Sequence, residues 1–128
     1  MSLIRRRALI ACALAATAAS AVAVPAVGGS ERSAKTAVVT VADDYFAPTD
    51  VTIKKDSKVK WVWSDLNTNT HNVLLTGTHP KGVKKSDFRS GSGAVQLVFK
   101  RKFTVPGKYG FICSFHRGVM TQTLTVKK

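Results

Sequence analysis

The chain has 128 residues, a formal net charge of +13 at pH 7 and 45% hydrophobic residues. With an export segment set aside, about 100 residues remain, which is enough for one domain with one hydrophobic core. Such a basic protein could bind nucleic acid, but no recognition motif for it is present and the N-terminus indicates export. We therefore exclude a nucleic-acid partner.

The N-terminal segment has the order of a secretory signal. Three arginines, Arg5 to Arg7, precede an uncharged apolar run that extends to Val27, and small residues such as Ala23 and Ala26 offer cleavage points. We predict a signal peptide over residues 1–26, with an uncleaved membrane anchor as the alternative. Whether export uses the Sec or the twin-arginine route stays open. The expected location is the periplasm or the outer face of the cell membrane.

The two cysteines differ in context. Cys12 lies in the export segment, where too few apolar residues precede it for a lipoprotein signal, so we interpret it as a signal-peptide residue. Cys113 is then the single thiol of the mature region and has no partner for a disulfide within the domain. A lone thiol in an oxidising compartment points to a function such as metal binding.

Short strands follow one another along the mature chain. Residues 27–36 are small and polar and predict a linker, and a single domain is expected over 37–128. Strand patterns occur at 38–41, 51–54, 58–64, 71–75, 95–103, 109–113 and 124–126. Residues 76–94 predict a long irregular connection. Arg101 falls where strict alternation would bury it, which predicts a bulge or break near Lys100.

These patterns predict an all-β fold. No window of helical length carries an apolar stripe, and about seven to eight short strands with frequent turns favour an antiparallel β-sandwich. The aromatic residues that we expect in the core are Trp61, Trp63, Phe103, Tyr109 and Phe111.

One stretch carries chemistry. Cys113, His116 and Met120 form C-x2-H-x3-M at the end of an expected strand. A thiolate, an imidazole and a thioether so close together suit copper, and His71 is the candidate second imidazole. Taken singly, each residue is more often a packing or surface residue, and only their conjunction favours a metal site. Zinc rarely takes a thioether, and no acyl-transfer arrangement is evident.

The sequence resembles the plastocyanin, amicyanin and pseudoazurin branch of the cupredoxins over residues 37–127. The similarity lies in YFAPTDVTIKKDSKVKWVW, in THNV at 70–73, in VPGKYGFICSFH and in TQTLTV after Met120. It implies a Greek-key β-sandwich with one type 1 copper at one end. By position, His71 and His116 would supply nitrogen, Cys113 the thiolate and Met120 the weak axial ligand.

The resemblance also assigns Asn72 to joining the two ligand loops. One departure concerns Met120, because three residues separate it from His116, whereas amicyanin-like loops have two and plastocyanin-like loops four. The six aspartates of the domain are interpreted as solvated turn residues rather than a catalytic pair. They are Asp43, Asp44, Asp50, Asp56, Asp65 and Asp87.

The expected function is single-electron transfer between redox partners by a protein that is not an enzyme. The family implies that His116 is the electron port. Three groups of Lys and Arg side chains favour an acidic redox partner and allow association with a membrane surface, and a monomer is expected. Two alternatives are a copper carrier or scavenger and a non-redox, surface-binding sandwich. The three basic groups are Lys54, Lys55, Lys58 and Lys60; Lys81, Lys84, Lys85 and Arg89; and Lys100, Arg101, Lys102 and Lys108.

Overall fold

The computed structural model describes residues 35–128. The strands are β1 (Thr36–Ala42), β2 (Tyr45–Ala47), β3 (Asp50–Lys54), β4 (Lys58–Trp63), β5 (Leu74–Leu75), β6 (Val98–Lys102), β7 (Gly107–Ile112) and β8 (Thr121–Lys127), with one 3-10 turn, η1 (Lys85–Phe88). The expected signal peptide, 1–26, and residues 27–34 of the expected linker lie outside the described residues. Among residues 35–128, no helix is long and apolar enough to cross a membrane.

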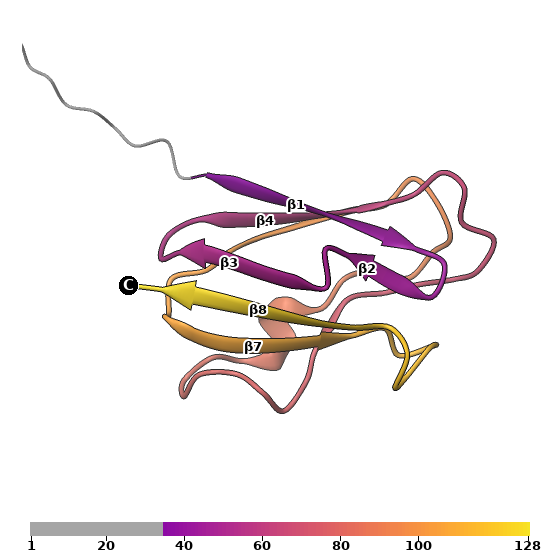
Figure 1. Ribbon diagram of the computed structural model, residues 1–128. Coiled ribbons are helices and arrows are strands. Elements are labelled where there is room, and N and C mark those ends of the chain that lie inside the picture. The colour runs from indigo at the N-terminus through magenta and orange to yellow at the C-terminus, as the bar shows by residue number, and fades with distance from the viewer. Residues whose placement is uncertain (1–34) are drawn as a thin grey trace, which may run out of the picture. The chain divides into compact units, whose positions relative to one another are not determined.

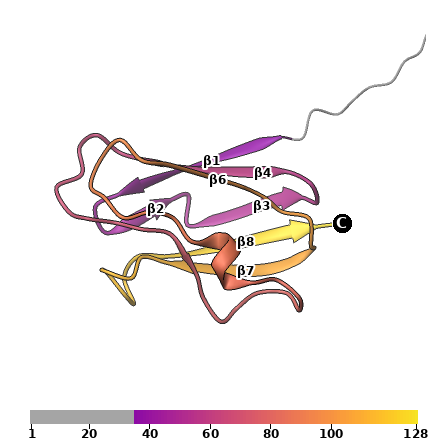
Figure 2. The ribbon, with the colours of Figure 1, turned by 180° about the vertical axis from the view of Figure 1, so that it is seen from behind.

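The strands form two four-stranded sheets, ordered β2-β1-β4-β6 and β3-β8-β7-β5, which lie as two layers in Figures 1 and 2. The predicted all-β sandwich is confirmed. Its description as antiparallel is wrong for two pairs, since β1 runs parallel to β4 and β3 runs parallel to β8. The parallel pairs arise because the chain crosses to the second sheet at β3 before it returns to the first at β4, as sandwich connections commonly do.

Strand β4 shows why this sequence folds in two layers. Val59, Trp61 and Trp63 are buried at alternate positions, and the residues between them are half-buried, as the period of a strand requires. All five predicted core aromatics are buried. The irregular connection supplies one more, Phe88 of η1, whose ring centroid lies 5.0 Å from that of Phe103.

The predicted bulge near Lys100 is wrong. Strand β6 pairs with β4 without interruption from Val98 to Lys102. Arg101 stays exposed although it lies on the same face of the strand as Phe99. Its guanidinium group lies 4.5 Å from the Phe99 ring centroid and its Nε donates to the carbonyl oxygen of Asp87. Because β6 is at the edge of its sheet, a long side chain can leave the core there.

The strand registers define two ends of the sandwich. Strand β4 is parallel to β1 and β7 is antiparallel to β8. Because β1 and β8 point to opposite ends in Figure 1, β1, β4 and β7 all run toward the end where β8 begins. We call this the site end, because the candidate ligands follow β4 and β7. At the opposite end Lys58 pairs with Lys102 and Lys54 with Lys127. We call it the lysine end, defined by Lys54, Lys55, Lys58, Lys102 and Lys127.

Candidate metal centre

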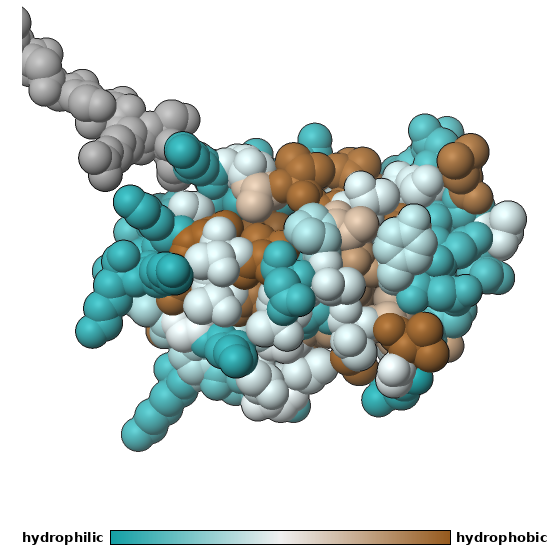
Figure 3. Space-filling view, in the orientation of Figure 1, coloured by the Kyte–Doolittle hydropathy of each residue, from teal (hydrophilic) through white to brown (hydrophobic). Residues whose placement is uncertain are grey.

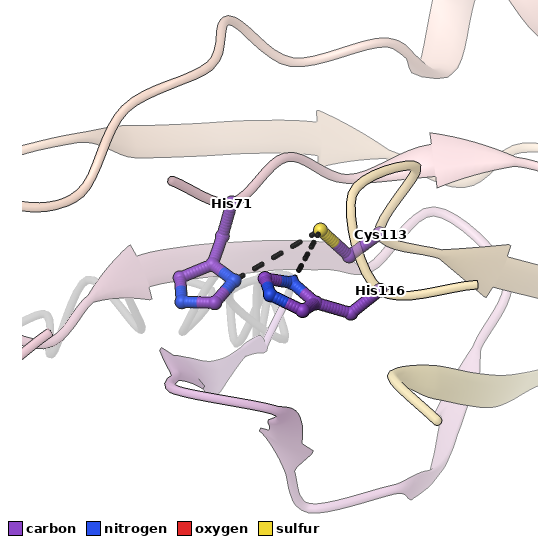
Figure 4. A group of neighbouring side chains, drawn as sticks. All are labelled: His71, Cys113 and His116. Carbon is purple, nitrogen blue, oxygen red and sulfur yellow. Dashed lines mark hydrogen bonds between the residues drawn. The ribbon is translucent and has the colours of Figure 1, made fainter. Parts of the chain in front are cut away.

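Three of the predicted ligands converge at the site end. The donor atoms of His71, Cys113 and His116 all lie within 4.8 Å of one another. Cys113 Sγ is 3.9 Å from Nδ1 of His71 and 3.7 Å from Nδ1 of His116, so both rings direct the same nitrogen toward the sulfur (Figure 4). His71 and Cys113 are fully buried, and the His116 side chain is 25% exposed.

The loop after β7 brings Cys113 and His116 together. The His116 carbonyl oxygen accepts hydrogen bonds from the backbone N–H groups of Val119 and Met120, at 3.3 and 3.0 Å. Gly118 has a φ of +84°, a left-handed conformation that glycine adopts without a steric penalty. These contacts fold the loop back, so that His116 lies beside the cysteine that begins it.

His71 lies in the connection between β4 and β5, and hydrogen bonds hold its backbone in place. Its N–H and carbonyl oxygen both bond to Gly93, at 3.0 and 3.1 Å, and the carbonyl also accepts from Nε1 of Trp63 at 3.2 Å. The ligand is therefore anchored through the indole of a core residue at the end of β4. Only the side-chain rotation of His71 is left to be set by other groups.

Met120 is fully buried. Its carbonyl oxygen accepts from the Cys113 N–H at 3.1 Å, while its own N–H donates to His116. The thioether therefore belongs to the interior next to the ligand loop. The backbone of Met120 is tied to both neighbouring candidate ligands despite the three-residue spacing.

Asn72 joins the two ligand loops. Its Oδ1 accepts from the Ser114 N–H at 2.8 Å, and its Nδ2 donates to Ser114 Oγ at 2.8 Å. The residue after His71 is thereby bonded to the residue after Cys113. The remaining histidine, His79, contacts the backbone oxygen of Pro80 and is not part of the cluster.

Sequence reasoning missed two acidic neighbours of the histidines. Asp43 Oδ1 accepts from His71 Nε2 at 2.7 Å, and Asp44 Oδ1 lies 3.6 Å from His116 Nε2. The hydrogen bonds from His71 and from the Thr68 N–H lower the pKa of the Asp43 carboxyl. Describing Asp43 as a solvated turn residue is therefore wrong. The sequence signal is that two acids directly follow β1, and it becomes meaningful once the fold brings this turn to the site end.

The donor set fits copper. It combines two imidazole nitrogens, one buried cysteine sulfur and the thioether of the buried Met120. The two acids lie at the Nε2 atoms of the imidazole rings, whereas the Nδ1 atoms face the sulfur. Soft sulfur with imidazole is the ligand chemistry that copper prefers, whereas calcium and magnesium require oxygen. Within residues 35–128, every buried side-chain nitrogen and oxygen has a hydrogen-bond partner.

Known structures share the fold. Amicyanin from Paracoccus versutus (Thiobacillus versutus) is 25% identical, with 73% of this chain and 83% of that chain covered and a TM-score of 0.59. A purple cupredoxin from Nitrosopumilus maritimus is 21% identical, with 71% and 99% covered and a TM-score of 0.59. The copper-containing nitrite reductase of Thermus scotoductus is 21% identical, with a TM-score of 0.62. That match covers 73% of this chain but only 23% of the reductase.

The family comparison agrees with these likenesses. Residues 35–127 match the model for copper-binding proteins of the plastocyanin/azurin family. The match spans nearly the whole described domain, including both ligand loops. The chain therefore belongs to the plastocyanin/azurin family of copper-binding proteins, with copper as its cofactor.

Proposed function

We propose that this protein is an exported carrier of single electrons that holds one type 1 copper with His71, Cys113, His116 and Met120. The observation that supports it best is the approach of two Nδ1 atoms to one buried cysteine sulfur. Copper at such a site supplies a one-electron couple between Cu(II) and Cu(I). The strands and the bonded loops keep the donors in place, so that little rearrangement accompanies the change of oxidation state.

His116 is the proposed route for the electron. Its ring is the one candidate ligand among His71, Cys113 and His116 with appreciable exposure, and Phe115 and Val119 beside it are 54% and 70% exposed. A partner that lies against this apolar surface would contact the imidazole edge directly. Small interfaces of this kind suit transient redox complexes.

The proposed partner is an acidic redox protein, and the chain is proposed to bind it as a monomer. Basic side chains gather toward the lysine end, and Figure 3 shows hydrophilic side chains projecting where β1 begins and β8 ends. They act on encounter through the field of the whole protein rather than by contact at His116. Electron exchange should therefore slow as salt is raised. Retention of vesicles containing anionic lipid would support the proposed membrane-surface association.

The proposal treats the chain as a carrier and not as an enzyme. The likeness to nitrite reductase covers 23% of that chain, so the shared part is a domain of it. A reversible one-electron wave at an electrode would support the carrier. A site that binds Cu(I) tightly but shows no reversible couple would favour copper handling.

Copper titration of the parent chain and of two cysteine variants tests the site. One equivalent of Cu(II) should give the full chain an intense visible absorption that Cys113→Ser abolishes and Cys12→Ser retains. Met120→Leu should keep the absorption but shift the reduction potential, because the axial ligand tunes it. If the absorption does not depend on Cys113, the proposal is wrong.

Mass spectrometry of the exported protein would show whether the chain is cleaved near residue 26.

A further inference from the structure

Asp43 is the most heavily bonded side chain around the metal centre. Its Oδ2 accepts from the N–H of Thr68 at 2.9 Å and from Oγ1 of the same residue at 2.8 Å. Its Oδ1 accepts from the Asn69 N–H at 3.2 Å and from His71 Nε2 at 2.7 Å. The carboxylate therefore joins the turn after β1 to the loop that carries the first histidine. It remains 30% exposed, whereas His71 is fully buried.

The contact with His71 determines which ring nitrogen is free. A carboxylate can only accept, so the 2.7 Å contact requires the proton to be on Nε2. In the neutral ring the lone pair is then on Nδ1, the nitrogen that lies 3.9 Å from Cys113 Sγ. A buried imidazole N–H needs an acceptor, and within the described residues Asp43 supplies it. The tautomer and the ring rotation that copper binding requires are thus set by one hydrogen bond.

We propose that Asp43 is a positioning residue for the copper site, holding His71 with Nδ1 toward Cys113 before the metal binds. A carboxylate on the outer nitrogen also makes the imidazole a stronger donor, which favours the more highly charged Cu(II) over Cu(I). This inference rests on the ligand set of the proposed function. It adds a residue from a different strand connection, 28 positions before the histidine it holds.

The neighbouring Asp44 provides a matched control. It belongs to the same turn and carries the same charge, but its carboxylate is 60% exposed and lies 3.6 Å from His116 Nε2, beyond a good hydrogen bond. Its φ of 69° is a conformation that asparagine tolerates. Asp44→Asn therefore removes one negative charge near the site without affecting the His71 contact.

The first test needs no copper. In the metal-free full chain at alkaline pH, nitrogen NMR should show His71 protonated at Nε2 in the parent and in Asp44→Asn. In Asp43→Asn the preference for this tautomer should be lost, because the amide can turn its own N–H toward the ring. Retention of the Nε2–H form in Asp43→Asn would overturn the proposal, whatever becomes of the proposed function.

The second test measures copper. Asp43→Asn should weaken Cu(II) binding by about 10- to 100-fold, the usual cost of losing such a partner, and raise the reduction potential. Asp44→Asn should stay close to the parent in both. Equal effects of the two variants would show a general charge effect and overturn positioning. Whether the site is of the thiolate–copper type is tested separately by Cys113→Ser.

A third variant distinguishes orientation of the His71 ring from ordering of the loop that contains Thr68. Thr68→Val removes the hydroxyl bond to Asp43 Oδ2 but keeps the backbone bond and the His71 contact. Copper affinity and the tautomer should remain near the parent values. If Thr68→Val weakens copper binding as much as Asp43→Asn, the carboxylate acts by ordering the loop, and the proposed role toward His71 is wrong.

Discussion

The site end and the aromatic region toward the lysine end are stabilised by different kinds of contact. Near the lysine end the rings of Phe88, Phe103 and Tyr109 pack within 5.0 to 5.8 Å of one another. At the site end, hydrogen bonds that Asp43 and Asn72 accept connect loops that contain few buried apolar residues. Packing therefore carries most of the folding energy in one region, while polar contacts fix donor positions in the other. The two properties should be separable by mutation.

The largest effect is expected from Phe103→Ala. This ring is fully buried and lies against Trp61, Phe88, Tyr109 and Phe111. Its loss should lower the free energy of unfolding by about 3–5 kcal/mol, as measured by denaturant titration of the metal-free chain. The copper absorption of the folded protein should persist, because this ring packs among aromatic residues toward the lysine end.

A surface valine controls for this experiment. Val98→Ala, on edge strand β6 and 59% exposed, should change the free energy of unfolding by no more than about 0.5 kcal/mol. If Phe103→Ala stays folded and still loses the copper colour, the two regions are not independent and the comparison fails.

Asn72→Ala should show the reverse pattern. It removes both contacts with Ser114 and leaves the Ser114 N–H without its acceptor. The free energy of unfolding should therefore fall by only about 1–3 kcal/mol. The copper spectrum should change, since the loops of His71 and Cys113 lose their connection. Ser114→Ala removes the hydroxyl alone and should have the smaller effect. An unaltered spectrum in Asn72→Ala would mean that the loops are positioned by their backbones.

The sequence alone predicted those features that depend on residues close together in the chain. Alternation along β4 predicted the burial of Trp61 and Trp63, and the close spacing of Cys113 and His116 marked the centre. Burial of a side chain every second residue follows from strand geometry alone. The copper family was recognisable for the same reason, because its motifs are contiguous stretches.

What the sequence left out depends on contacts between distant segments. The role of Asp43 exists only because the parallel pairing of β1 and β4 brings the turn after β1 next to the loop after β4. Phe88 sits in a charged segment without periodicity, and its burial becomes evident only when η1 packs against β7 residues. Arg101 departs from the alternation of buried and exposed residues because β6 is an edge strand, where a long side chain can reach solvent.

Gly107→Ala probes the backbone of the lysine end. Gly107 begins β7 with a φ of +139°, and an added Cβ would lie 2.7 Å from Pro80 Cγ. Alanine is strained at such a φ, so the free energy of unfolding should fall by more than about 1 kcal/mol. Gly91→Ala, which has open space and no such φ, should be close to neutral in the same denaturation experiment. Equal stability of the two variants would show that the β7 start can move away from Pro80.

Tyr109→Phe should have the smallest effect at neutral pH. The Tyr109 hydroxyl donates to the Val105 carbonyl oxygen at 2.7 Å, and its removal should cost about 0.5–1.5 kcal/mol. Burial raises the pKa of Tyr109, so the folded chain keeps this proton after the unfolded chain has lost it. Its stabilising effect is therefore complete below about pH 10 and is lost as the pH rises toward the folded-state value.

Unfolding titrations across alkaline pH should thus show a decline in the parent that is reduced in Tyr109→Phe. Tyr45, which is 54% exposed, gives the control, because Tyr45→Phe should keep the decline of the parent. If Tyr109→Phe declines as steeply as the parent, the buried hydroxyl is not responsible. The aromatic region would then owe its stability to packing alone, and the contrast with the hydrogen-bonded site end would be sharper than the Tyr109 contact suggests.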